Sequence, residues 1–235
     1  MRNQRRPLLF PTDRSNLRSV KPWHPLAYIV RELPRRLGRL ACDLSCPPDG
    51  QVLDYGCADI PYRRFFPSGV HYIAADLPGN PDATTTINDD GTVPVPDATI
   101  DSVISTQVLE HVLDPDLYLR ECYRVLRPGG RLLLSTHGFM VYHPDPDDYW
   151  RWTCAGLRHA VGQAGLEVVR FEGIMGLSAS GLQLLQDGIY LRLPRAVRPV
   201  VALLFQTLIA TVDRFERPSS RDLNALVFAL VAIKP

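Results

Sequence analysis

The segment VLDYGCADIPYRRFF (residues 52–66) decides the fold, because an apolar strand runs into a glycine turn and then into a helical pattern. We expect a strand over 51–55, a turn at Gly56 and a helix near 60–66. The same pattern predicts further strands at 71–75, 84–87, 102–105, 131–135, 166–171 and 225–233. It predicts further helices at 26–44, 115–126 and 153–164. Strands alternating with helices indicate an α/β fold: a doubly wound, mostly parallel, seven-stranded sheet with helices on both faces.

Local residues set the ends of several helices. Asp114 is expected as an N-cap with Pro115 at the first helical position, and Thr153 as the N-cap of the helix ending near 164. Pro34 is expected to kink or restart the first helix. The Pro-Gly-Gly run at 128–130 is expected to end the helix that begins at Pro115.

We expect one domain over 25–235, preceded by a basic arm over 1–24. The arm has no hydrophobic signal segment, which favours a cytoplasmic protein, at most peripheral to a membrane. The five cysteines form no Cys-x-x-Cys pair, so reduced thiols are expected rather than a zinc site or disulfides. The net charge of +1 gives no case for a nucleic-acid partner.

A helical insertion is expected over 176–224, before the last strand. Residues 199–212 (PVVALLFQTLIATV) are uncharged, and arginines stand on both sides of them. These fourteen residues are too few to cross a bilayer, which takes about 20. Three interpretations stay open for this helix: burial in the core or in a dimer interface, a lid over the acceptor, or peripheral membrane contact through 195–216.

Acidic residues fall at the ends of three successive expected strands: Asp54, Asp76, and the pair Asp89 and Asp90. Ligands of a doubly wound sheet bind beyond these strand ends. A nicotinamide dinucleotide is the main alternative ligand, but the loop over 56–61 has a single glycine and its acids would repel two phosphates. A ligand carrying a sulfonium and an ammonium group suits these acids better, which favours S-adenosyl-L-methionine.

Four segments resemble successive motifs of class I S-adenosylmethionine-dependent methyltransferases of the type-11 domain group: VLDYGCADIPYRRFF, YIAADLPG, VPVPDATIDSVISTQVLEHV and YRVLRPGGRLLLS. The resemblance covers about 52–175, and 225–235 is similar to the family's final, antiparallel strand. It implies that Asp54, Gly56, Ala58 and Gln107 contact the methionine part of the cofactor and that Asp76 binds both ribose hydroxyls. It also implies that Asp89 and Asp90 flank the adenine and that Leu77 belongs to the same site. Ala58 stands where the family usually has a second glycine.

Two histidines are the candidate catalytic residues. His137 follows the fifth expected strand, and His143 opens the run HPDPDDYWRWT (143–153). A similar run occurs in family members associated with sugar and polysaccharide modification. Histidine is the usual general base near neutral pH, and a hydroxyl acceptor benefits from such a base.

The structural alternative assigns this region no catalytic part. Trp150 and Trp152 would anchor the loop, Asp148 would cap it or pair with Arg151, and His137 would hold a backbone carbonyl. In the neighbouring LEH element, the charge of Glu110 suits a helix N-terminus, and His111 is expected to be packed and hydrogen-bonded. The set His143, Asp145 and Asp147 lacks a regular ligand spacing, so no metal site is predicted.

The sequence therefore predicts a methyltransferase that uses S-adenosyl-L-methionine and acts on an oxygen of a small-molecule, sugar or lipid-linked acceptor. Two alternatives remain: a non-catalytic cofactor-binding protein of the same fold, and a membrane-surface interaction protein. The oligomeric state is left open.

Overall fold

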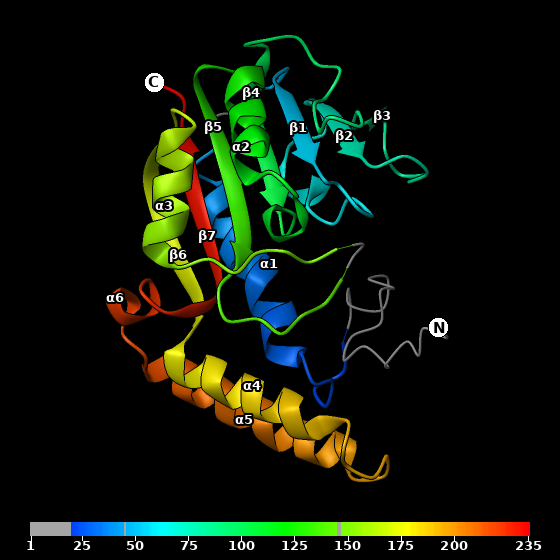
Figure 1. Ribbon diagram of the computed structural model, residues 1–235, viewed down its shortest axis with the longest axis vertical. Coiled ribbons are helices and arrows are strands. Elements are labelled where there is room, and N and C mark those ends of the chain that lie inside the picture. Colours follow the sequence, from blue (N-terminus) through cyan, green and yellow to red (C-terminus); the bar gives the residue numbers. More distant parts are fainter. Residues whose placement is uncertain (1–19, 45, 145–146) are drawn as a thin grey trace.

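The computed structural model describes residues 20–44, 46–144 and 147–235. Most of the arm expected over 1–24 lies outside these residues, as does Asp145. The strands are β1 (Gln51–Tyr55), β2 (His71–Asp76), β3 (Thr85–Thr86), β4 (Ile100–Thr106), β5 (Leu126–His137), β6 (Glu167–Gly176) and β7 (Ala225–Ile233). They form one seven-stranded sheet in the order β3-β2-β1-β4-β5-β7-β6 (Figure 1).

Strand direction decides which ends meet. Neighbouring strands from β3 to β5 pair in parallel, whereas β7 pairs antiparallel with both β5 and β6. The expected sheet and its antiparallel last strand are therefore confirmed. Val227 of β7 pairs with His137 on one side and with Ile174 on the other. The carboxyl ends of β5 and β6 consequently lie at the same edge of the sheet.

The helical segments are α1 (Ala27–Ala41), η2 (Arg63–Phe65), η3 (Leu109–His111), α2 (Pro115–Val125), α3 (Cys154–Gln163), α4 (Leu177–Tyr190), α5 (Arg198–Phe215) and α6 (Pro218–Arg221). Helices α2 and α3 cover one face of the sheet, where Leu119 and Leu157 join a cluster with Val103 and Leu132. Helix α1 covers the other face with Leu37 and Leu40. Both faces are thus buried, which explains the near-continuous apolar runs of the central strands.

The expected caps are present. Asp114 accepts a hydrogen bond from the backbone N–H of Leu117 at 2.9 Å, and Thr153 accepts one from Gly156 at 3.0 Å. Pro34 does not restart the first helix, because α1 continues through it.

The expected helix near 60–66 is wrong, since this stretch holds only the short 3-10 segment η2. Ile60 has φ 53°, outside the right-handed helical region, and Pro61 follows it. The Pro-Gly-Gly run at 128–130 does not end α2, because this helix already ends at Val125. Residues 128–130 instead form an irregular bulge within β5.

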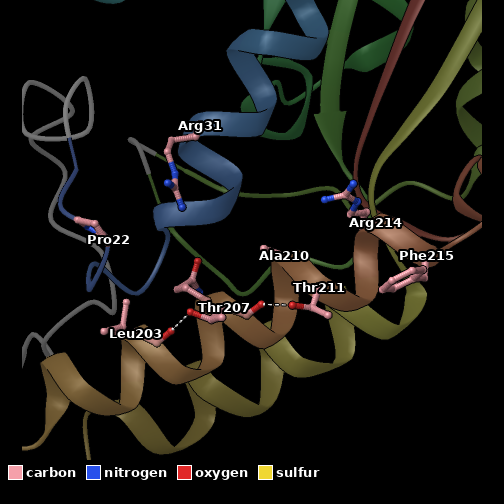
Figure 2. Close-up of a pocket in the computed structure, with 9 residues that line it drawn as sticks. Pro22, Arg31, Leu203, Thr207, Ala210, Thr211, Arg214 and Phe215 are labelled. Atoms are coloured by element: carbon pink, nitrogen blue, oxygen red, sulfur yellow. Dashed lines mark hydrogen bonds between the residues drawn. The ribbon is translucent and has the colours of Figure 1, made fainter.

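The region expected as a helical insertion holds α4, α5 and α6. Helices α4 and α5 pack side by side beyond the carboxyl edge of the sheet (Figure 1). A pocket of about 640 Å³ opens between α5 and the first turn of α1, with Arg31 and Arg214 in its lining (Figure 2). No helix within the described residues is both long and apolar enough to cross a membrane.

Glutamine side chains fasten these two helices to α1. The side-chain amides of Gln183, Gln186 and Gln206 all donate to the carbonyl oxygen of Pro25, at 3.0, 2.7 and 2.8 Å. The carbonyl of Gln206 in turn accepts from the backbone N–H of Tyr28 at 2.8 Å. The inward faces of α4 and α5 therefore carry buried glutamines among their apolar residues, and hydrogen bonds hold these helices against α1.

This contact gives a stability prediction. Replacing Gln206 by alanine leaves the partly buried N–H of Tyr28 without its acceptor, so we expect the free energy of unfolding to fall by about 1–3 kcal/mol. Thr207→Ala is the control, because Thr207 is exposed and its hydroxyl donates to the Leu203 carbonyl within its own helix. Urea denaturation followed by circular dichroism measures both. Equal stability of Gln206→Ala and the wild type would contradict this account.

Candidate active site

Several predicted site residues gather at the carboxyl ends of the parallel strands. Asp54 lies near the end of β1, Asp76 ends β2, Gln107 follows β4 and His137 ends β5. These four strands are consecutive in the sheet, in the order β2-β1-β4-β5. Chain segments far apart in sequence therefore meet at one edge, where ligands of doubly wound folds bind.

The turn after β1 is tight and its backbone is strained. Gly56 has φ 84°, and a Cβ atom there would lie 2.5 Å from Cγ2 of Val108. Glycine is thus required by conformation and by space. Ala58 and Ile60 also have positive φ, at 47° and 53°. Ala58 adopts a conformation that glycine takes more easily, in agreement with its place at a usual glycine position of the resembling family.

Asp76 organises this turn. Its Oδ2 accepts from the backbone N–H of Ala58 at 2.8 Å and from the side-chain amide of Asn80 at 2.6 Å. Its Oδ1 accepts from the N–H of Leu77 at 2.8 Å. A carboxylate has about four acceptor positions, so binding two ribose hydroxyls requires Asn80 to withdraw.

Asp54 is almost completely buried beneath the turn. Burial raises the pKa of Asp54 to about 7. The hydrogen bond donated by the Tyr72 hydroxyl, at 2.5 Å, opposes this increase, and the charge of Asp76 adds to it. A cation bound beside this carboxyl would favour its ionised form.

The remaining predicted cofactor residues lie beside Asp76 or directly after β3 and β4. Leu77 is half-exposed beside Asp76. Asp89 and Asp90 lie in an exposed turn after β3, where Asp90 accepts from the N–H and the hydroxyl of Thr92. The Gln107 amide donates to the Ser135 hydroxyl at 3.0 Å and so joins the ends of β4 and β5.

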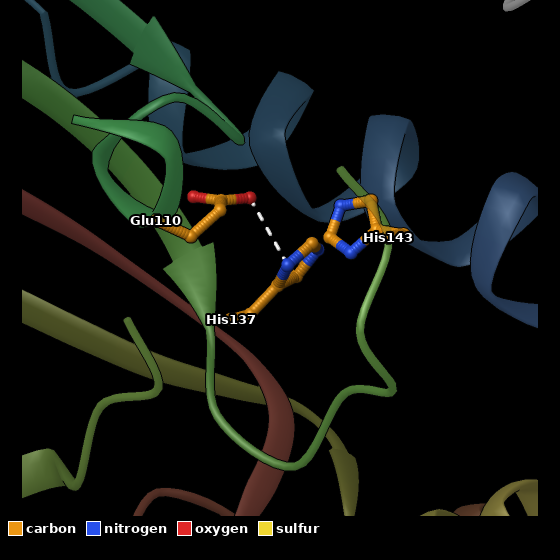
Figure 3. Close-up of side chains that lie close together, drawn as sticks. All are labelled: Glu110, His137 and His143. Atoms are coloured by element: carbon orange, nitrogen blue, oxygen red, sulfur yellow. Dashed lines mark ion pairs between the residues drawn. The ribbon is translucent and has the colours of Figure 1, made fainter. Parts of the chain in front are cut away.

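Glu110, His137 and His143 form a cluster at the end of β5 (Figure 3). Nδ1 of His137 lies 3.1 Å from Oε1 of Glu110, whose Oε2 accepts from the Thr136 hydroxyl at 2.9 Å. Glu110 is fully buried, and His137 is nearly so. The rings of His137 and His143 meet edge to face, with centroids 4.6 Å apart. Burial holds the pKa of His143 below its ordinary value, against the opposing charge of Asp148.

The loop that carries His143 is held by an ion pair. Asp148 binds Arg151 through both oxygens at 2.6 Å, and it accepts from the backbone N–H of His143 at 2.8 Å. The indole N–H of Trp150 donates to the Val112 carbonyl at 2.8 Å. These contacts confirm the structural part of the loop interpretation. His137, for which a backbone carbonyl contact is expected, contacts the side chain of Glu110.

Sequence reasoning missed the position of Glu110. The expected helix N-terminus is the short 3-10 segment η3, and the Glu110 side chain points to His137 instead (Figure 3). His111 is packed as expected, with Nδ1 against the carbonyl of Asp147. Tyr72 and Asn80 were also missed, because their contacts cross from one loop or strand to another. The LEH element (109–111) was the only sequence signal that pointed to a role for Glu110.

The same cluster has the composition of a metal ligand set. One ligand atom from each of Glu110, His137 and His143 lies within 4.8 Å of the others. This set differs from His143, Asp145 and Asp147, of which Asp145 lies outside the described residues. A chelator control therefore belongs in any test of these histidines.

Known proteins and a protein-family model are similar to parts of this chain. A family model described as a methyltransferase domain matches residues 26–170. A probable S-adenosylmethionine-dependent methyltransferase of Mycolicibacterium smegmatis is 46% identical over 55 residues, which is 23% of this chain and 21% of that protein. The malonyl-[acyl-carrier protein] O-methyltransferase of Serratia marcescens is 33% identical over 129 residues, 51% of this chain and 49% of that protein. The matched stretches thus span about a fifth and about half of these two relatives.

Among solved structures, that of geranyl diphosphate methyltransferase in complex with SAM has a similar fold. Its TM-score is 0.56 at 15% sequence identity, and the match covers 95% of this chain and 95% of that one. At this identity the likeness concerns the fold.

Proposed function

Because the chain belongs to the family of methyltransferase domains matched over 26–170, we propose that it transfers a methyl group to an oxygen of a small-molecule, sugar or lipid-linked acceptor. The cofactor is S-adenosyl-L-methionine, on which the M. smegmatis relative is named as dependent. The buried contact between Glu110 and His137 is the observation that favours oxygen as the methylated atom. A hydroxyl acceptor must lose its proton during transfer, and a histidine paired with a carboxylate can accept that proton.

The acids of the edge suit this cofactor. Among the described residues, Asp54 and Asp76 accept hydrogen bonds from two backbone N–H groups, an amide and a hydroxyl. These donors are neutral and leave the negative charge of the turn uncompensated, so the turn favours a cationic ligand over a phosphate. We assign the methionine part to Asp54, Gly56, Ala58 and Gln107, the ribose to Asp76, and the adenine to Asp89 and Asp90, with Leu77 as a further cofactor contact. Withdrawal of Asn80 from Asp76 frees that carboxylate for the ribose.

His137 acts as the general base in this proposal. Its contact with Glu110 favours the tautomer that carries the proton on Nδ1, in which Nε2 is the basic nitrogen that takes the proton of the acceptor hydroxyl. Bound S-adenosylmethionine supplies the electrophilic methyl carbon, whose bond to sulfur breaks as the bond to the acceptor oxygen forms. Glu110 is a positioning residue that also stabilises the imidazolium.

His143 completes the acceptor side. Its ring lies on the side of His137 away from Glu110 (Figure 3). Its lowered pKa keeps it neutral at pH 7, so it can donate or accept a hydrogen bond to the acceptor without repelling the cationic cofactor. We further propose that residues 195–216 contact a membrane peripherally, which brings a lipid-linked acceptor to this edge.

The pKa of Asp54 predicts the pH dependence of cofactor binding. The cationic cofactor favours ionised Asp54, so binding releases a proton and affinity rises as the pH passes through about 7. We expect binding at pH 6 to be about tenfold weaker than at pH 8. Asp54→Asn should retain only the dependence of the cofactor's own amino group, whose pKa is about 8. Calorimetry at several pH values measures both, and identical profiles for the two proteins would exclude this role of Asp54.

A second prediction concerns the ribose. Asp76→Ala removes an acceptor whose charged hydrogen bonds contribute about 1.5–3 kcal/mol each, so affinity for S-adenosylmethionine should fall at least about tenfold. Asn80→Ala is the control: it removes the competing amide and should bind the cofactor at least as well as the wild type. Calorimetry on folded protein, checked by circular dichroism, measures the change. Wild-type affinity in a folded Asp76→Ala variant would falsify the assignment.

The general base gives a third prediction. With a hydroxyl acceptor found by screening for S-adenosylhomocysteine formation, His137→Ala should lose about 10²–10⁴-fold in kcat while cofactor affinity stays unchanged. Glu110→Gln should lose less and should shift the pH profile of kcat, because it acts through His137. His159→Ala, an exposed histidine on α3, should keep the wild-type rate.

Two outcomes would overturn this assignment. One is a full rate for His137→Ala across pH 6 to 8. The other is a wild-type rate that chelator abolishes and a divalent cation restores, since Glu110, His137 and His143 would then act as metal ligands. Absence of S-adenosylhomocysteine formation with every acceptor, despite cofactor binding, would favour a non-catalytic protein.

A further inference from the structure

Helices α4 and α5 have their polarity reversed relative to an ordinary surface hairpin. Their polar residues face inward: Gln183 and Gln206 are 0% and 2% exposed. Many of their large apolar residues face solvent, with Leu185 at 55%, Leu204 at 65% and Phe215 at 79%, although Ile209 is buried in the core. Exposed apolar side chains gathered on two neighbouring helices indicate an interaction site. We call it the outer face of α4 and α5; its apolar members are Leu177, Leu184, Leu185, Leu191, Val200, Leu203, Leu204, Leu208 and Phe215.

Hydrogen bonds fix this orientation. Besides the three glutamine amides on the Pro25 carbonyl, buried Asp213 accepts from the Tyr28 hydroxyl at 2.6 Å and from the N–H of Gly176 at 2.8 Å. Rotating either helix to bury its leucines would break these bonds and strand polar groups in the interior. The outer face therefore needs cover from outside the described fold.

The charges around the outer face have one sign. Within 177–217 every fully exposed charged side chain is an arginine, namely Arg192, Arg195, Arg214 and Arg217. The acids Asp187 and Asp213 are buried, and partly buried Glu216 accepts from the N–H of Leu177. An apolar face with arginines at both ends complements a surface that is apolar inside and anionic at its boundary.

The pocket beside α5 adds a place for an anionic group. Arg31 of α1 and Arg214 of α5 approach it from two different elements, and Thr207 and Thr211 line its floor (Figure 2). Phe215 lies at one end of it and is part of the outer face. Guanidinium and hydroxyl groups beside apolar side chains suit a lipid phosphate with its acyl chain.

The outer face lies at the active-site edge of the sheet. Helix α4 begins directly after Gly176, the last residue of β6, and the ends of β6 and β5 lie at the same edge. A surface bound to the outer face would therefore lie on the side of the molecule towards which the carboxyl ends of β5 and β6 point (Figure 1).

We propose that the outer face of α4 and α5 binds the headgroup layer of a bilayer rich in anionic lipids, with a lipid phosphate in the pocket between Arg31 and Arg214. This inference deepens the peripheral contact proposed above for 195–216: it adds α4, the sign of the lipid charge and the phosphate site. It rests on that part of the proposed function, but lipid binding is measured without methyl transfer, so either can fail alone.

Vesicle sedimentation of the full chain tests the proposal. We expect binding to vesicles of phosphatidylcholine with about one third phosphatidylglycerol, and binding at least about tenfold weaker to phosphatidylcholine alone. High salt should weaken the first interaction. Because this comparison uses the wild type, it holds whether or not a variant folds. Failure to sediment with the anionic vesicles would overturn the proposal.

Matched variants locate the surface. Leu185→Ser with Leu204→Ser should lower binding to anionic vesicles about tenfold or more, whereas Val169→Ser, at an exposed position of β6, should not. Arg214→Glu should lower it by a similar factor, and Arg120→Glu on α2 should leave it unchanged. Equal loss in the controls would refute this location. A wild-type dimer that the leucine variants dissociate, without vesicle binding, would show that a second copy covers the face.

Discussion

Parallel pairing of β1, β2, β4 and β5 is the constraint on which the rest of the structure depends. It brings Asp54, Asp76, Gln107 and His137 to one edge, although they are far apart in the chain. Because β7 pairs antiparallel with both β5 and β6, these two strands run in the same direction, and their carboxyl ends lie at the same edge. The proposed cofactor site, the proposed base and the helices that follow β6 thus share one side of the molecule.

This edge is also where the backbone is strained. Ala58, Ile60 and Gln107 have φ of 47°, 53° and 56°, a region that costs a residue with a side chain about 1–2 kcal/mol. Hydrogen bonds oppose the strain: Asp76 accepts from the N–H of Ala58, and Gln107 bonds to Ser135 through its N–H and its amide. Strain that the surroundings maintain is common at functional sites, and it fits the position of this turn beneath the proposed cofactor.

Acidic and basic groups are separated across this side of the molecule. The carboxyl groups of Asp54 and Glu110 are buried near the sheet, whereas the exposed charges of α4 and α5 are arginines. The inner charges suit a cationic cofactor and an imidazolium, and the outer charges suit an anionic surface. The glutamine contacts with Pro25 connect the two regions, since they hold α1, α4 and α5 in one arrangement.

The sequence alone determined what depends on local pattern. Period and turn residues predict the alternating strands and helices, the caps at Asp114 and Thr153, and the position of His137 at a strand end, because each follows from neighbours along the chain. Tertiary structure decided the rest. The contact of Glu110 with His137 needs η3 to lie against β5, and the short η2 results from the backbone at Ile60. The apolar run at 199–212 predicts a helix but not which face of the helix is exposed. The exposed face depends on the hydrogen bonds of Gln206 with Tyr28 and Pro25, which are distant in sequence.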